Sequence, residues 1–174
     1  MLIIGIDPGV SGAVGLLNSL GHYLCVYDIP TVLANKSSNR QMVSPVDLAN
    51  LLREIVAEEK GGSVVAITEN VGAMPGQANI SMFAFGKSLG ILFGVLAALE
   101  IPTHIVSPVK WKKHFYLGKE KGQSRELAQR MWPTAPLGLK KHHNRAESLL
   151  LAKYYVDTSS QLMVKKRPRI LSLL

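Results

Sequence analysis

The sequence predicts an α/β domain with a five-stranded mixed sheet flanked by helices. Three β-rich runs, 2–6, 13–17 and 22–30, follow one another with short turns between them, a pattern typical of an antiparallel meander. A fourth run, 64–69, follows a helical pattern and is expected to lie parallel to the first, and 101–107 supplies the fifth strand. The chain has 174 residues, 47% of them hydrophobic, which suits one domain with a full core and is too short for two.

The first strand delivers an acid. Its apolar run, 2–6, is followed by Asp7, and the strand breaks at once in Pro8-Gly9. A carboxylate at the end of a central strand costs several kcal/mol to bury unless a cation or hydrogen bonds compensate it. Three interpretations stay open: an Asx turn onto Gly9, a cation ligand, or a turn whose glycines let the backbone approach phosphates.

The run 64–69 repeats this design, because its apolar residues lead to Glu69 and a glycine-bearing break follows. Parallel neighbouring strands would place Asp7 and Glu69 side by side at one edge of the sheet. Two carboxylates at so short a distance raise each other's pKa unless a cation is bound between them, and this favours a divalent metal site. The alternative is that Glu69 is a solvated residue at a strand end.

A helix is expected after the meander. Ser44 as the N-cap and Pro45 in the first turn begin it, and Gly61-Gly62 ends it. The polar segment 32–43 before this helix is expected to be a loop that borders a ligand.

A long apolar helix is expected over 79–99, and it carries a ridge of small residues four apart: Gly86, Gly90, Gly94 and Ala98. Glycine inside a helix costs about 0.5–1 kcal/mol relative to alanine, so close approach of another backbone is the natural compensation. That backbone belongs either to the sheet or to the same helix of a second subunit. We expect the ridge to pack on the sheet, with the opposite side around Met82, Phe85 and Leu89 open to a dimer partner.

Charge is divided unevenly along the chain. Residues 1–86 carry four Lys/Arg against seven Asp/Glu, and residues 87–174 carry sixteen against five, within a net charge of +8. This asymmetry indicates that the second half of the chain binds a polyanion, such as nucleic acid, next to an acidic site that lies mainly in the first half. Basic residues interleave with aromatic ones over 108–116, which suits a face that contacts phosphates. A solvated basic face pinned by aromatic core residues is the alternative.

The last helix is expected over 148–156. His143 and Glu147 precede it, lie four residues apart and therefore share a helical face. Glu147 is a third acid that meets the first two if this helix lies across the sheet end, and otherwise it is a surface residue. The expected division is a domain over 1–157 and a basic tail over 158–174.

Composition also predicts where the protein works. The chain has a single cysteine, Cys25, so no intrachain disulfide can form. Its start lacks a basic segment and a cleavage pattern, and its apolar runs are interpreted as too short to span a membrane. We therefore expect a non-secreted, cytoplasmic protein that makes no membrane contact.

Several motifs, in order, resemble one known family. The element order resembles the ribonuclease-H-like fold, and Gly5-Ile6-Asp7-Pro8-Gly9 with Thr68-Glu69 is similar to the RuvC family of Holliday-junction resolvases. Further matches resemble its phage-type branch: Met74-Pro75-Gly76-Gln77, Phe83-x-Phe85-Gly86, Pro108-x-x-Trp111-Lys112 and Arg145-Ala146-Glu147-Ser148. The resemblance implies a homodimeric endonuclease of DNA recombination and repair, in a bacterial or phage-infected cell. It would nick opposed strands of a four-way DNA junction.

The resemblance also implies a metal site with two magnesium or manganese ions. Asp7, Glu69 and Glu147 would be the acidic ligands and catalytic residues. The family generally has a fourth acidic or histidine ligand just before the last acid, and this chain has no Asp there. His143 is the first choice for that position and Asn144 the second, and His143 is alternatively a general acid or base. An imidazole ligand would shift the preference towards manganese.

The DNA contacts would come from basic residues and one loop. The backbone contacts are expected from residues of the basic second half: Lys110, Lys112, Lys113, Lys119, Lys121, Arg125, Lys140, Lys141 and Arg145. The loop 71–77 follows Glu69, so Met74 and Gln77 are expected near the junction, with Met74 as an apolar wedge or simply packed in its loop.

Three rival functions stay open. The first is a nuclease of the same fold that cuts RNA in hybrids or other branched DNA. The second is a nucleotide-binding phosphotransferase that uses Asp-Pro-Gly as a phosphate turn. The third is a junction-binding protein with weak catalysis, because the fourth acid is missing.

Overall fold

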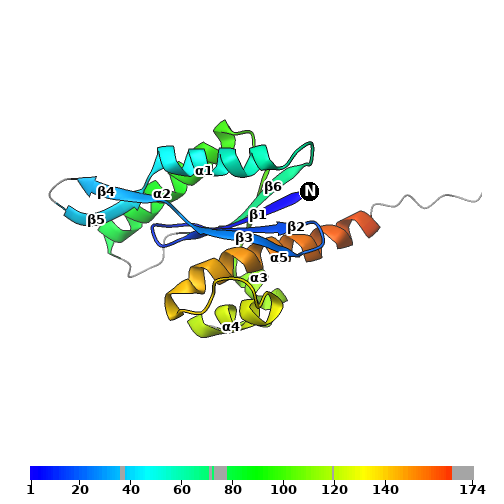
Figure 1. Cartoon of the computed structure of the whole chain (residues 1–174). Coiled ribbons are helices and arrows are strands. Elements are labelled where there is room, and N and C mark those ends of the chain that lie inside the picture. Colours follow the sequence, from blue (N-terminus) through cyan, green and yellow to red (C-terminus); the bar gives the residue numbers. More distant parts are fainter. Residues whose placement is uncertain (36–37, 71, 73–77, 119, 166–174) are drawn as a thin grey trace, which may run out of the picture.

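The computed structural model describes residues 1–35, 38–70, 72, 78–118 and 120–165. Five strands form its central sheet in the spatial order β3-β2-β1-β6-β7 (Figure 1). They are β1 (Leu2–Asp7), β2 (Ala13–Asn18), β3 (Tyr23–Asp28), β6 (Val64–Glu69) and β7 (Thr103–Val106). The first three pair antiparallel, whereas β6 is parallel to β1 and β7 is parallel to β6. The predicted mixed sheet with its meander is confirmed.

Helices cover both faces of this sheet (Figure 1). On one face lie α1 (Pro45–Glu58) and α2 (Asn79–Ala98). On the other lies α5 (His143–Lys165), preceded by the short 3-10 helix η1 (Lys140–His142), with α3 (Pro108–His114) and α4 (Lys121–Met131) in the same layer. α5 begins earlier and ends later than the predicted 148–156, and the domain boundary at 157 remains a prediction.

Side-chain alternation along the central strands decides which way the acids point. Ile3 of β1 and Ile67 of β6 belong to the core on the α5 side, whereas Ile4 packs against α1 and α2. Because successive side chains of a strand point to opposite faces, Asp7 and Glu69 lie on the same side as Ile3 and Ile67. Both carboxylates are therefore on the face that α5 covers.

Two glycines let α5 lie directly on the sheet. Gly5 of β1 and Gly15 of β2 are paired across the two strands. A Cβ at Gly5 would overlap the backbone of Ser148 and Ala152, and a Cβ at Gly15 would stand 2.9 Å from the Leu149 nitrogen. The helix thus touches the sheet backbone in the turn that follows Glu147, which fixes the position of that residue.

The polar segment before α1 is not the predicted loop. It forms a separate two-stranded antiparallel sheet of β4 (Thr31–Asn35) and β5 (Ser38–Val43), in which Thr31 pairs with Val43. The prediction was wrong because the polar run 35–41 hid the apolar residues at both ends of the segment, where Val32 pairs with Met42 and the two strands hold each other. The expected start of α1 is confirmed, since the Ser44 hydroxyl accepts a hydrogen bond from the Asp47 backbone N–H at 3.3 Å.

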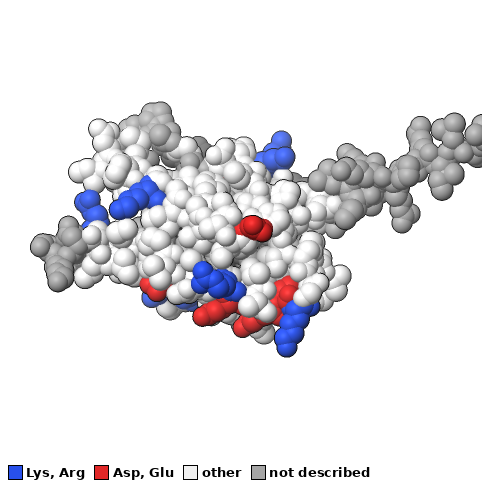
Figure 2. Space-filling model, turned by 90° about the horizontal axis from the view of Figure 1, so that it is seen from above, with Lys and Arg blue, Asp and Glu red and all other residues white. Residues whose placement is uncertain are grey.

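The glycine ridge of α2 does not pack on the sheet. Leu92 and Leu96 are the buried residues on the sheet side, whereas Gly86, Gly90 and Gly94 are exposed with no atom within 4 Å of a Cβ built on them. The expectation of ridge-on-sheet packing is therefore wrong, because branched side chains fill the sheet side and leave the small residues outside. Figure 2 looks onto the α1–α2 layer, where the Lys, Arg, Asp and Glu side chains gather mainly along one edge of the view and leave a white area beside them.

The expected absence of a membrane-length apolar run also needs correction. Among the described residues α2 is one helix whose length and composition suffice to cross a bilayer, with a mean hydropathy of 1.8 and 17% of the window buried. Such a helix is equally compatible with packing against another protein surface.

Candidate active site

Three acids from distant parts of the sequence meet at one edge of the sheet. Asp7 ends β1 and Glu69 ends β6, and the parallel register that pairs Ile6 with Thr68 brings these two strand ends next to each other. Glu147 lies in the second turn of α5, on the face of the sheet to which both acids point. The three charges act on one another, since Glu69 and Glu147 both perturb Asp7.

The environment of Asp7 disfavours its charged form. Burial raises the pKa of Asp7 well above its usual range, and the charges of Glu147 and then Glu69 raise it further. The Lys112 ammonium acts in the opposite direction and lowers this pKa. Asp7 thus lies in an environment with too much negative charge, which a bound cation would relieve.

Glu69 is held by a buried tryptophan. Its side chain is 7% exposed, and the fully buried Trp111 of α3 donates an indole N–H to Oε1 at 2.5 Å. Burial raises the pKa of Glu69, the Trp111 hydrogen bond lowers it, and the Glu147 charge raises it again. A buried indole N–H needs an acceptor, so this pair fixes one oxygen of Glu69 and also anchors α3 to the sheet.

Glu147 is held from two other helices. The Ser124 hydroxyl of α4 donates to Oε1 at 3.0 Å, and the Lys112 ammonium of α3 lies 3.3 Å from the same oxygen. Lys112 also lies 5.1 Å from the centre of the Trp111 ring. A protein cation thus already stands beside the acids and offsets part of their charge.

The donor chemistry of the site fits a divalent cation. All hydrogen bonds and ion pairs of Glu69 and Glu147 with described residues go to Oε1, which leaves the second oxygen of each carboxylate for another partner. Carboxylate oxygens are the ligands that magnesium prefers. Within the described ranges, however, no three His, Cys, Asp or Glu side chains are close enough to hold one ion as they stand.

The two candidates for the fourth ligand have protein partners of their own. His143 Nδ1 lies 3.4 Å from the Lys140 carbonyl oxygen, and Asn144 Nδ2 donates to the Ser11 carbonyl at 2.5 Å. The Asn144 contact ties the start of α5 to the turn that follows Asp7. A ligand role for either residue remains a prediction.

The predicted DNA contacts fall into three groups. Some are exposed on α3 and on η1, namely Lys110, Lys113, Lys140 and Lys141. Three have partners inside the domain: Lys112 with Glu147, Arg125 with Gln129 and the Leu137 carbonyl, and Arg145 with Asp28. Met74, Gln77 and Lys119 lie outside the described residues, as does the side chain of Lys121.

Arg145 is the clearest case of an internal partner. Its Nε and Nη2 donate to the two oxygens of Asp28, each at 2.6 Å, and Nη1 donates to the Pro136 carbonyl. This bidentate pair joins α5 to the end of β3, and its hydrogen bond lowers the pKa of Asp28.

Sequence reasoning missed how the acids are supported. Ser124 had no signal in the sequence, because a serine inside a polar helix has no distinguishing pattern. Trp111 did have one, since a tryptophan in a basic helix is expected to be buried and its N–H then requires an acceptor.

No protein-family model and no curated protein matches the chain. Solved structures do match. T. thermophilus RuvC in complex with a Holliday junction substrate has a TM-score of 0.61 at 18% identity, over 92% of this chain and 97% of that one. A second structure, of Thermus thermophilus RuvC, has a TM-score of 0.49 at 16% identity, over 91% of this chain and 97% of that one. The chain therefore has the ribonuclease-H-like fold of RuvC over almost its whole length.

Proposed function

We propose that the chain is a divalent-metal-dependent endonuclease that nicks four-way DNA junctions. The observation that carries the proposal is the convergence of Asp7, Glu69 and Glu147 at one sheet edge, beside a layer rich in Lys and Arg. The fold shared with RuvC, whose solved complex contains a Holliday junction, supports the choice of DNA substrate. Membership of the phage-type branch stays a prediction from the motifs.

The acids would hold the metal ions through the oxygens that have no described partner. Asp7 would lie between the two glutamates, with Glu69 kept in place by Trp111 and Glu147 by Ser124. Two magnesium or manganese ions, when bound, would supply charge neutralisation at the scissile phosphate and an activated water. His143, or Asn144 in its place, would complete the set from the first turn of α5.

Lys112 would offset part of the negative charge of the acids before DNA binds. Its ammonium neutralises part of the carboxylate charge at 3.3 Å from Glu147, and it lies on α3 beside the exposed Lys110 and Lys113. These exposed lysines, with Lys140 and Lys141, would contact the DNA backbone and bring the scissile phosphate to the acids.

A homodimer follows from the substrate and from α2. A four-way junction offers two opposed strands, so paired nicks require two sites. The face of α2 with Phe83, Gly86, Gly90 and Gly94 is exposed and apolar except for Lys87, and its glycines permit close approach of a second helix backbone. We therefore assign this face, rather than the side around Met82 and Leu89, to contact with a second copy of the chain.

Cleavage of defined substrates tests the function. Labelled four-way junctions, duplexes with the same arm sequences and RNA–DNA hybrids would be incubated with magnesium or manganese. The wild type should nick the junction at symmetrical positions and leave the duplex and hybrid intact. Asp7→Asn should bind the junction and nick it more than about 100-fold more slowly, because even outer residues of metal sites contribute 10–100-fold.

Asp47→Asn is the matched control, since it removes the same charge from α1 and should nick at the wild-type rate. Preferred cleavage of the hybrid would support the rival nuclease. Junction binding with no nicking at any metal concentration would reduce the protein to a junction-binding module.

A further inference from the structure

A pocket of about 510 Å³ lies beside the turn that follows Asp7. Three separate elements line it. The turn contributes Val10, β5 contributes Asn39, Arg40 and Gln41, and α2 contributes a row of residues that includes Ser81 and Phe85. Its volume falls in the range of small-molecule sites, about 300–1,000 Å³, and suits a single nucleotide.

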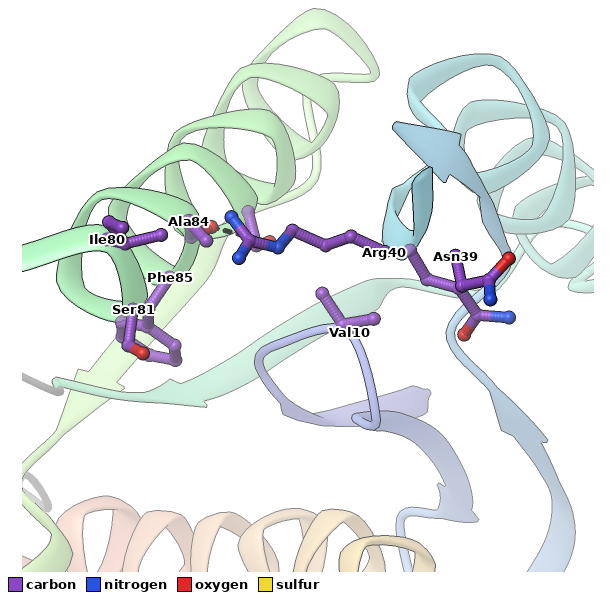
Figure 3. Close-up of a pocket in the computed structure, with 9 residues that line it drawn as sticks. Val10, Asn39, Arg40, Ile80, Ser81, Ala84 and Phe85 are labelled. Carbon is purple, nitrogen blue, oxygen red and sulfur yellow. Dashed lines mark hydrogen bonds between the residues drawn. The ribbon is translucent and has the colours of Figure 1, made fainter. Parts of the chain in front are cut away.

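The pocket has an apolar wall and a hydrogen-bonding wall. Phe85 and other α2 residues form the first together with Val10 of the turn, and the Arg40 guanidinium lies on the second, whereas Asn39 and Gln41 alternate with Arg40 along β5 and direct their side chains to its other face. Figure 3 shows Arg40 extended from β5 across the pocket towards α2, with its end beside Ala84. An aromatic ring and a guanidinium group in one pocket match the needs of a nucleobase, which stacks by its face and pairs by its edge.

This pocket shares a loop with the candidate active site. Val10 is three residues after Asp7, so their Cα atoms are at most about 11 Å apart. The Phe85 ring packs against Gly9, with its Cε2 3.8 Å from where a Cβ would stand, and Gly9 has the positive φ of 127° that glycine tolerates best. The turn after Asp7 thus connects the two sides of the sheet: a DNA strand that crosses the end of β1, with its phosphate at Asp7 on the α5 side, would have a neighbouring base near Val10 on the α2 side.

We propose that this pocket receives one base of the cleaved strand next to the scissile phosphate and sets the sequence preference of nicking. The base stacks on Phe85, while the Arg40 guanidinium hydrogen-bonds to its edge. The proposal rests on the proposed nuclease function and assigns specificity to β4–β5, a hairpin outside the central sheet. A good bidentate contact to a base discriminates about 5- to 150-fold against the wrong base.

Nicking of a junction series tests this assignment. Each junction would carry one of the four bases at each position flanking the cleavage site, and rates would be compared for wild type, Arg40→Gln and Phe85→Leu. The wild type should prefer one base by at least about 5-fold, and both variants should reduce that preference while binding the junction as before. Asn50→Ala removes an amide from exposed α1 and should keep the wild-type preference.

Two outcomes overturn the pocket assignment although the nuclease function stands. One is a wild type that nicks all junctions at equal rates. The other is a variant that slows all junctions by one factor with its preference intact, which would indicate a phosphate contact or a structural role.

A second measurement separates the pocket from catalysis. Junctions with 5-bromouracil beside the cleavage site would be irradiated on the protein in EDTA, and crosslinked peptides identified by mass spectrometry. The proposal predicts crosslinks to Phe85 or the 39–41 segment, and crosslinks elsewhere alone would refute it. A wild type that crosslinks there but never nicks would refute the nuclease function and leave the base pocket supported.

Discussion

At the scale of single residues, the site is defined by carboxylates that the fold destabilises. Burial and mutual repulsion raise the pKa values of Asp7 and Glu69, so the folded protein holds their negative charge less readily than the unfolded chain. Trp111 and Lys112 offset only part of this effect. Buried carboxylates with raised pKa values are typical of functional sites, where side chains needed for ligand binding lower the stability of the folded protein.

The raised pKa of Asp7 predicts how stability depends on pH. Because the native state binds this proton more tightly than the unfolded state, the free energy of unfolding should fall as pH rises from about 3.9 through the raised native pKa. Asp7→Asn removes the penalty, so at neutral pH it should raise Tm by about 2–4 °C, corresponding to about 1 kcal/mol. Thermal unfolding from pH 4 to pH 8 without divalent metal measures both.

Asp47→Asn serves again as the control and should not reproduce the gain. If Asp7→Asn lowers Tm throughout this pH range, the carboxylate stabilises the apoprotein, and the electrostatic account of the site is incorrect.

The acids themselves were predictable from sequence, but their partners were not. Asp7 and Glu69 each follow an apolar run, so strand order alone places them together. The pairs Trp111–Glu69, Ser124–Glu147 and Arg145–Asp28 join segments 23 to 117 residues apart. Such pairs depend on how helices sit on the sheet, which local patterns do not specify.

At the scale of elements, the contact of α5 with the sheet determines where Glu147 lies. Gly5 and Gly15 remove side chains where the helix crosses, and the Asn144–Ser11 and Arg145–Asp28 contacts hold its first turn. Both glycines are visible in the sequence as interruptions of apolar strands. Only the register of β1 with β2 shows that they are neighbours and together form one area of the sheet without side chains.

Gly5→Ala should therefore displace α5. The added Cβ would meet backbone atoms of Ser148 and Ala152 that cannot rotate away, so the free energy of unfolding should fall by about 1–3 kcal/mol or more. Nicking of the junction should fall as well, because Glu147 moves with the helix. Denaturant unfolding and a nicking assay measure the two effects.

Gly138→Ala is the matched control, because no atom lies within 4 Å of its added Cβ, and it should change stability by less than about 0.5 kcal/mol. Equal stability of Gly5→Ala and Gly138→Ala would contradict the proposed docking of α5.

Other elements show the limits of pattern reasoning. The meander, α1 and the parallel strands carry strong apolar periodicity, and all were predicted. The β4–β5 pair has a polar middle, 35–41, which concealed the strand signal of Val32, Leu33, Met42 and Val43 at its ends. The small residues of α2 were identified correctly, but they face away from the sheet and not onto it. A row of glycines on a helix is compatible either with close packing against another backbone or with exposure to solvent. Here the burial of Leu92 and Leu96 on the sheet side shows that the glycines are exposed.

At the scale of the whole molecule, charge and apolar surface lie in different layers. The α3–α5 layer holds most of the basic residues and the supports of the acids. In the α1–α2 layer the charged side chains gather along one edge of the view in Figure 2, and α2 carries a mainly apolar exposed face. DNA and a second subunit would thus occupy separate surfaces, and the pocket at β5 lies where the second layer meets the active-site turn.

Gly90→Leu tests the assignment of the second subunit. In the monomer the position is open and a helix favours leucine over glycine, so folding should be preserved. In the dimer the new side chain would block close approach of the helices. Light scattering after gel filtration should show a wild-type dimer and a monomeric variant, with Gly138→Leu still dimeric.

A wild type that is monomeric at concentrations where it nicks junctions would contradict the dimer. Recruitment of the monomer to lipid vesicles through α2 would instead assign this face to a membrane.

The most direct test of the central claim is the location of manganese in crystals of the wild-type protein. The account predicts anomalous scattering from Mn²⁺ within coordination distance of Asp7, Glu69 and Glu147, with the Oε2 atoms of both glutamates turned to the metal. Saturating Mn²⁺ that binds elsewhere, with the three carboxylates directed to separate places, would contradict it.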